Sequence, residues 1–314
     1  MTFGDSQGFM KGVTSPDDEA RAVLDRALAF GIDFIDTANM YSEGRSETLL
    51  GQWLGPKRKS VILATKVRFP MGPGVMDQGL SRRHIIQACE DSLVRLNTDW
   101  IDLYQVHMQD GSVPIDETLR ALDDLVRWGK VRYIGCSNYA GYRLVESVGA
   151  AEKLHTARYE SVQLQWHLLE RGAEREVIPA CRAFDLGVMV WSPLARGLLS
   201  GKYHQGQPPP SGARLEAWKD SWARADERTW KVLDALRAVS QEVGASPAQV
   251  AIAWLLSKAE VTSVIVGART VKQLEENLGA ATLKVPPAQL AALDRASEPQ
   301  WGYPYDFIAM RERW

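Results

Sequence analysis

The sequence predicts a (β/α)8 barrel, in which eight parallel strands are each followed by a helix. Two observations indicate this fold class. Short apolar runs alternate with longer helical patterns along all 314 residues, as in parallel α/β folds. Polar or ionisable side chains also stand at the ends of several runs, where barrel enzymes carry their chemistry. An open, doubly wound parallel sheet is the alternative. No stretch resembles an interdomain linker, so we expect one domain over residues 1–314.

The expected strands are apolar runs too short for helices. The first follows Gly31, a residue suited to ending a helix because glycine tolerates a left-handed backbone, and it finishes abruptly in polar residues from Asp36 onward. Seven strands are expected, over residues 33–36, 61–66, 101–107, 131–138, 161–165, 187–191 and 261–267.

The expected helices have start signals or helical apolar spacing. Ser15 is a natural N-cap, and Pro16 follows at a position where proline is favoured. Ser246 and Gln249 have the spacing of a capping box, and Thr270 and Gln273 repeat it. The helices are expected over residues 15–29, 46–54, 81–96, 115–128, 142–151, 174–184, 227–243, 246–258, 270–280 and 287–296.

Composition is that of an ordinary soluble globular protein and argues against a nucleic-acid or membrane partner. The net charge of −2 gives no large basic surface. No apolar run approaches the ~18 residues of a membrane-spanning helix. The first residues lack the features of a signal peptide. Three widely spaced cysteines suggest neither disulfides nor a metal site, so we expect a cytoplasmic protein.

Polar residues at the strand ends form the candidate site. Each one alone has an ordinary structural explanation, such as a turn residue or a surface charge. Ionisable groups on successive strands are harder to explain in that way, because parallel strand ends form one face of a barrel. The residues in question are Asp36, Tyr41, Lys66, His107, Ser137, Asn138, Gln163 and Trp191.

These side chains suit carbonyl chemistry. Asp36 can supply the counter-charge that a buried Lys66 needs. We expect Lys66 to lower the pKa of Tyr41 from about 10, so that the phenol can give a proton to a carbonyl oxygen. His107 would hydrogen-bond the same oxygen. None of these groups delivers a hydride readily, so a cofactor is expected.

The chain resembles the aldo-keto reductase family over essentially its whole length. The resemblance rests on the motifs GIDFIDTANMY, ATK, DLYQVH, GCSNY, VMVWSPLARGLLSGKY and VIVGARTVKQLEENL. It is nearest to bacterial reductases and to a branch that includes potassium-channel β subunits. It implies a (β/α)8 barrel that reduces aldehydes or ketones, with Asp36, Tyr41, Lys66 and His107 as catalytic residues.

The resemblance also implies a nicotinamide cofactor, usually NADP(H), with NAD(H) as the alternative. Ser137, Asn138 and Gln163 match the residues that bind the carboxamide, and Trp191 matches the aromatic that stacks on the nicotinamide. The pyrophosphate loop corresponds to Ser192, Leu194, Arg196, Gly197, Lys202 and Arg214. The adenosine end corresponds to Gly267, Arg269, Gln273, Glu276 and Asn277, with Arg269 suited to a 2′-phosphate. No metal is implied.

Family members usually begin with a short hairpin and a first barrel strand that ends in a stretch like Gly-Thr-Met-Thr-Phe-Gly. This sequence starts inside that stretch, at Met1 to Gly4. We therefore expect the hairpin and most of the first strand to be missing from this chain, which would leave two strand edges without a neighbour.

Three functions are compatible with these residues. The leading hypothesis is NADP(H)-dependent reduction of a small carbonyl substrate, with Tyr41 as proton donor. The alternative is a cofactor-binding regulatory subunit with slow or vestigial reductase activity, in which case a partner protein is expected. An aldolase with Lys66 as Schiff-base lysine is the third, but it leaves Ser137, Asn138, Gln163 and Trp191 without a role. The sequence allows oligomers and does not identify the substrate.

Overall fold

The computed structural model describes residues 2–4, 11–211, 213–217 and 226–311. The chain divides into two compact units. The first comprises Met1–Gln163, Phe184–Gly187 and Gly267–Leu274, and the second comprises Leu164–Ala183, Val188–Val266 and Glu275–Trp314. The expected single domain stays a prediction.

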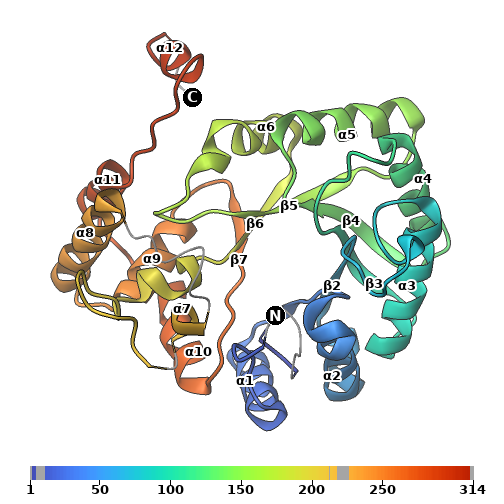
Figure 1. Ribbon diagram of the computed structural model, residues 1–314, viewed down its shortest axis with the longest axis horizontal. Helices are drawn as coiled ribbons and strands as arrows, with labels where there is room; N and C mark the ends of the chain where they lie inside the picture. The colour runs from blue at the N-terminus through green and yellow to red at the C-terminus, as the bar shows by residue number, and fades with distance from the viewer. Residues whose placement is uncertain (1, 5–10, 212, 218–225, 312–314) are drawn as a thin grey trace. The chain divides into compact units, whose positions relative to one another are not determined.

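The first unit is built on parallel strands that follow chain order. They are β1 (Phe34–Asp36), β2 (Ile62–Val67), β3 (Ile101–Val106), β4 (Val131–Ser137) and β5 (Tyr159–Gln165). The helices of this unit, blue to green in Figure 1, are α1 (Asp17–Phe30), α2 (Arg45–Leu54), α3 (Arg82–Leu96), α4 (Ile115–Arg127) and α5 (Gly141–Leu154). From α2 to α5, each helix packs against the next one. Strand interiors are apolar and buried, as expected of a parallel sheet covered by helices.

Main-chain pairing fixes the strand ends on which the site depends. Lys66 of β2 is directly opposite Gln105 of β3. The pairing continues beyond the strands, since the His107 N–H donates to the Val67 carbonyl at 2.9 Å. The polar residues that follow the apolar runs are therefore held by the sheet itself.

The start of α1 differs from the prediction. The residue at its N-cap is Pro16, which offers no side-chain cap. Ser15 instead donates its hydroxyl to the Arg269 carbonyl at 2.9 Å. The acidic first turn of the helix complements the partial positive charge there. At the other end, Gly31 adopts the expected left-handed conformation with φ 100°.

The second unit contains two parallel strands, β6 (Gly187–Trp191) and β7 (Val261–Val264). β7 ends earlier than residue 267, and only the Ile265 N–H continues the pairing, to the Val190 carbonyl at 2.8 Å. The helices are α6 (Val177–Phe184), α7 (Arg214–Ala217), α8 (Glu227–Val243), α9 (Pro247–Leu256), α10 (Val271–Leu278), α11 (Pro287–Ala296) and α12 (Tyr305–Ala309). Helices α8 and α11 pack side by side (Figure 1).

The 3-10 segments were not predicted from the sequence. They cover Tyr41–Gly44, Gly55–Ser60, Val75–Asp77, Gly172–Arg175, Ala195–Ser200 and Gly279–Ala281. The last follows α10 directly, so the expected helix over residues 270–280 is an α-helix that tightens into a 3-10 turn at its end.

Trp254 lies at the centre of the second unit and is fully buried. Its ring packs edge-on against Trp166, with centroids 6.2 Å apart. Its indole N–H donates to Asp294 Oδ1 at 2.9 Å, and Lys258 donates to the same oxygen at 2.7 Å. A buried tryptophan needs such a partner, because an unpaired N–H in the core is costly.

The parallel strands, each with its helix, confirm the (β/α)8 fold class, with seven strands within the described residues. Among the described residues, the segment expected to end the first barrel strand forms only an isolated bridge between Phe3 and Ser15. No helix in the described ranges has the length and apolar character needed to cross a bilayer. The cysteines Cys89, Cys136 and Cys181 are all buried, and none of them is joined in a disulfide.

Candidate active site

A buried ion pair lies at the centre of the candidate site. Lys66, from the end of β2, is fully buried. Its Nζ donates to Asp36 Oδ2 at 2.5 Å and to the Thr37 carbonyl at 2.7 Å. Asp36 ends β1, so the partners come from neighbouring strands. Pairing of this kind is what makes a buried ammonium tolerable.

The second oxygen of Asp36 accepts two further hydrogen bonds. Gln163 Nε2 donates to Asp36 Oδ1 at 2.8 Å, and Gln105 Nε2 donates to it at 3.0 Å. The two glutamines also contact each other, since Gln163 Nε2 lies 3.2 Å from Gln105 Oε1. The carboxylate is therefore held from three strands, β2, β3 and β5.

Gln105 is the site residue that sequence analysis missed. A signal was present in IDLYQVH, because side chains two apart in a strand share a face, and Gln105 lies two residues before His107. An amide that is fully buried within an otherwise apolar run needs polar partners. Those partners are Asp36 and Gln163.

Tyr41 and His107 complete the cluster in the first unit. The Lys66 Nζ lies 5.1 Å from the Tyr41 ring centroid. The rings of Tyr41 and His107 meet edge to face with centroids 5.5 Å apart, and Phe69 contacts the other side of His107 at 4.9 Å. Tyr41 opens a 3-10 turn after β1 rather than lying in an irregular loop.

The expected lowering of the Tyr41 pKa is wrong in direction. Burial of the phenol raises its pKa above the usual value, the Lys66 charge opposes this rise, and the Asp36 charge adds to it. Removing the hydroxyl from water disfavours the phenolate more than one ammonium favours it, because that ammonium is already paired with a carboxylate.

Lys66 remains positively charged. Burial alone would lower its pKa, but the charge of Asp36 and the interactions with Asp36 and Tyr41 raise it above the usual value. His107 is neutral instead, because burial and the nearby Lys66 hold its pKa well below the usual range. Within the described residues, His107 Nδ1 has no hydrogen-bond partner.

Ser137 ends β4 and Asn138 follows it, beside this cluster. Ser137 is buried and Asn138 is exposed. Asn138 has a left-handed backbone with φ 54°, and its Nδ2 donates to the His107 carbonyl at 2.8 Å and to Ser137 Oγ at 2.9 Å. The structure thus brings Ser137, Asn138 and Gln163 together with the four expected catalytic residues.

The segment expected to hold the adenosine end begins at Gly267. The Arg269 N–H donates to Gln273 Oε1 at 3.0 Å, and the Gln273 N–H donates to Thr270 Oγ1 at 3.2 Å. Gln273 thereby caps the start of α10, whose N-terminus is the end that favours anions. Further along α10, Glu276 is exposed and Asn277 is buried.

The expected pyrophosphate loop lies in the second unit. Ser192, Ala195, Arg196 and Gly197 all have positive φ values. The Arg196 N–H donates to Ser192 Oγ at 3.2 Å. Two further N–H groups also bond within this segment, Ala195 to the Ser192 carbonyl at 2.9 Å and Gly197 to the Leu194 carbonyl at 2.8 Å.

The other expected residues of the second unit flank this loop. Trp191 ends β6 and is partly buried, as is Leu194, while Lys202 is exposed. The Lys202 Nζ lies 5.4 Å from the Tyr203 ring centroid. Arg214 opens α7, but its side chain lies outside the described residues.

Comparisons with known proteins agree with this geometry. The family model described as the aldo/keto reductase family matches residues 1–298. The uncharacterized oxidoreductase YrpG of Bacillus subtilis is 40% identical over 288 residues, covering 87% of this chain and 85% of YrpG. A probable voltage-gated potassium channel subunit beta of Arabidopsis thaliana is 37% identical over 269 residues, covering 83% of this chain and 81% of its own. A putative aryl-alcohol dehydrogenase of Schizosaccharomyces pombe is 34% identical over 312 residues, covering 91% of this chain and 94% of that protein. The chain belongs to the aldo/keto reductase family of oxidoreductases.

Proposed function

We propose that the protein reduces aldehydes or ketones to alcohols, with NADPH as hydride donor and Tyr41 as proton donor. One observation carries the proposal. Tyr41, Lys66, Asp36 and His107 form a single cluster in which the phenol is protonated, the lysine is cationic and paired with Asp36, and the histidine is neutral, as carbonyl reduction requires.

Tyr41 acts as the acid. Its raised pKa keeps the phenol protonated at neutral pH, so a proton is available when negative charge develops on the carbonyl oxygen. Lys66 is the only group of the cluster that is cationic, and it stabilises the phenolate left by that transfer. Asp36 holds the ammonium in place.

His107 orients the substrate. Because its imidazole is neutral, it can serve as a hydrogen-bond partner of the carbonyl oxygen without competing with Tyr41 for the role of acid. Gln105 and Gln163 fix Asp36, and through it Lys66, so the charge is arranged before the substrate arrives.

The cofactor would supply the hydride that none of these side chains can provide. The exposed Asn138 amide next to Ser137 suits a nicotinamide carboxamide, and the left-handed residues of the 192–197 segment suit a pyrophosphate. Trp191 is assigned to the nicotinamide ring and Arg269 to a 2′-phosphate. These assignments support NADPH, with NADH as the alternative cofactor.

Steady-state oxidation of NADPH tests the proposal. An activated aromatic aldehyde such as 4-nitrobenzaldehyde should be reduced with a kcat in the ordinary enzyme range, about 1–10³ s⁻¹. A substrate panel of aryl aldehydes, aliphatic aldehydes and ketones would then define the preferred class. Formation of the alcohol in equal amount to the NADPH consumed is the required product check.

A regulatory subunit is the second candidate, because relatives at 37% and 36% identity are probable potassium channel β subunits. In that case the cofactor would bind tightly while turnover stayed far below the enzyme range. Measuring NADPH affinity by fluorescence alongside turnover separates the two functions. An oligomer and a cytoplasmic location stay predictions.

A further inference from the structure

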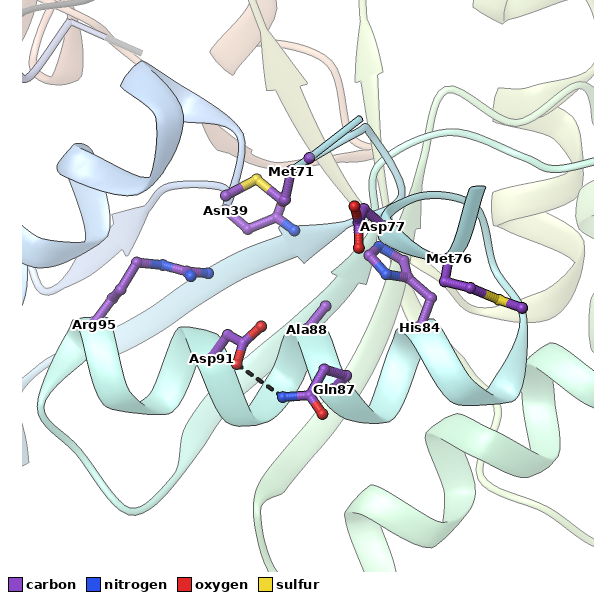
Figure 2. A pocket seen from close by; sticks show the side chains of 10 residues that line it. Asn39, Met71, Met76, Asp77, His84, Gln87, Ala88, Asp91 and Arg95 are labelled. Carbon is purple, nitrogen blue, oxygen red and sulfur yellow. Dashed lines mark hydrogen bonds between the residues drawn. The ribbon is translucent and has the colours of Figure 1, made fainter. Parts of the chain in front are cut away.

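A polar cavity lies in the first unit, and the catalytic side chains do not line it. Its volume is about 220 Å³, room for several waters or a small ligand, since a water occupies about 30 Å³ in the liquid. Figure 2 shows α3 along one wall, with His84, Asp91 and Arg95, and the opposite wall formed by Asn39, Met71 and Asp77. Neither Tyr41, Lys66 nor His107 lines it.

Two buried side chains at this cavity carry polar atoms that have no partner within the described residues. Asn39 is fully buried, yet neither its amide nitrogen nor its amide oxygen makes a hydrogen bond. In Figure 2 the Asn39 nitrogen points toward the centre of the cavity. His84 is 5% exposed, and its Nε2 is also unpartnered. Buried polar atoms without partners are rare and costly, so their partner is expected to occupy the cavity.

The cavity is acidic. Among the described residues, neither Asp77 nor Asp91 forms an ion pair, although Asp77 accepts from the Gly74 N–H and Asp91 from Gln87. Among the described lining residues, the one cation is Arg95. Its charge is already paired, because Arg95 Nε donates to the fully buried Glu47 at 2.7 Å. A carboxylate has room for about four hydrogen bonds, so both aspartates can accept more.

His84 adds an acceptor rather than a charge. Burial lowers its pKa, and its ring hydrogen-bonds the Met76 backbone. A neutral imidazole that donates from one nitrogen accepts at the other, which leaves Nε2 facing the cavity as an acceptor. The lining thus offers acceptors from His84, Asp77, Asp91 and the Asn39 side-chain carbonyl, and its N–H donors come from Asn39, Gln87 and Arg95, of which the last two already donate to carboxylates.

We propose that this cavity is a binding site for a small organic cation, an alkylguanidinium or alkylammonium. Such a ligand brings the N–H donors that the acceptors lack and the positive charge that the aspartates lack. The thioether of Met71 can pack against its alkyl part. Among the described residues, no group of three or more His, Cys, Asp and Glu side chains is arranged to hold a metal ion, so an organic cation is the better match. The proposal does not depend on the reductase activity.

Calorimetric titration of the full-length protein tests the site. The probes are methylguanidinium chloride and N-methylurea, which have the same size and differ in charge, at constant ionic strength. We expect saturable binding of methylguanidinium and at least tenfold weaker binding of N-methylurea. Equal affinity for both probes, or no saturable heat with methylguanidinium, overturns the proposal.

Variants localise the binding. Asp91→Asn removes an exposed carboxylate from the wall and should weaken methylguanidinium at least tenfold. Glu90→Gln makes the same charge change on the same helix, outside the cavity lining, and should leave the affinity within twofold. If both variants lose the same amount, the effect is general electrostatics and the site is wrong.

Asn39→Leu tests the unpartnered amide directly. The substitution is similar in size and should abolish methylguanidinium binding while leaving the Tm of the ligand-free protein equal or higher, because no hydrogen bond is lost. A large fall in Tm would show that the amide had a partner within the protein. A crystal structure with the probe should show it in the cavity, and density for waters only would overturn the proposal.

Discussion

At the scale of single residues, the acidity of Tyr41 decides how the cluster can act. Its phenol stays protonated because burial outweighs the Lys66 charge. Lys66 therefore serves less to generate phenolate at rest than to stabilise it once the proton has left. Burial disfavours ionisation of the Tyr41 phenol at rest. It also strengthens the attraction between the Lys66 ammonium and the negative charge that develops on the phenol oxygen during proton transfer.

Tyr41→Phe should lower kcat for carbonyl reduction by about 10²–10⁴-fold, the usual contribution of a positioned acid. Cofactor affinity should change little, since the ring remains. Tyr142→Phe makes the same change at a residue that is 68% exposed and should leave kcat unaltered. Steady-state kinetics with fluorescence titration of NADPH check both, and wild-type kcat in Tyr41→Phe would remove its role.

Gln105→Leu removes one of two amide donors to Asp36. We expect kcat to fall about tenfold, equivalent to about 1.4 kcal/mol of transition-state stabilisation, because Lys66 is then held less firmly. Gln52→Leu, at an exposed position on α2, is the control. A loss confined to thermal stability, with kcat unchanged, would limit Gln105 to a structural role.

Arg269→Ala should weaken NADPH binding by about 10–100-fold, as expected for loss of a charge-assisted hydrogen bond of roughly 1.5–3 kcal/mol. NADH binding should change much less, because NADH lacks the 2′-phosphate. Lys272→Ala, at an exposed position in the first turn of α10, is the matched control. Equal losses for both cofactors would separate Arg269 from the 2′-phosphate.

The site residues that could be predicted from the sequence lie either in a recognisable motif or at the end of an expected strand. Asp36, Lys66 and His107 each follow an apolar run. Gln105 lies inside such a run, and only the pairing of β2 with β3 shows that it reaches Asp36. The direction of the Tyr41 pKa shift could not be predicted from the sequence either, because it depends on how fully the folded protein buries the phenol relative to the nearby charges.

At the scale of elements, start signals were reliable where the capping side chain had no competing partner. Ser246 Oγ accepts from the Gln249 N–H, and Gln249 Oε1 accepts from the Ser246 N–H, as the capping box predicts. Ser15 has the same local sequence logic, yet its hydroxyl bonds the distant Arg269 carbonyl. A tertiary contact overrides a local preference here, and no local pattern reveals it.

Ser246→Ala should destabilise the protein by about 1 kcal/mol, the usual effect of losing an N-cap. The loss reflects the hydrogen bond from the Gln249 N–H to Ser246 Oγ at the start of α9. Ser211→Ala, at an exposed turn position, provides the comparison. Urea unfolding monitored by circular dichroism measures the difference, and equal midpoints for both variants would contradict the cap's contribution.

At the scale of the whole molecule, buried histidines link stability to pH. Burial lowers the pKa of His167 to about 3, and His107 is also held well below its usual pKa. The unfolded chain binds protons at these histidines near pH 6.5 and the native chain does not. Stability is therefore fully present above about pH 6.5 and falls as the pH drops toward 3.

Unfolding free energy should decrease by about 2 kcal/mol between pH 7.5 and pH 5 through His167, from about 1.4 kcal/mol for each pH unit below 6.5, and His107 acts in the same direction. Urea titrations at both pH values measure this. His167→Gln should reduce the decrease, whereas His155→Gln, at an exposed position, should not. A pH-independent midpoint in the wild type would contradict the linkage.

The burial of the three cysteines has a practical consequence for a protein that handles electrophiles. Desolvation raises the thiol pKa values of Cys89 and Cys181 to about 12, and Cys136 is fully enclosed between strands. Aldehydes and their unsaturated relatives attack thiolates, so these side chains resist alkylation by the compounds that the protein is proposed to turn over. A single cysteine engineered on the surface would accordingly be the one position that maleimide dyes modify.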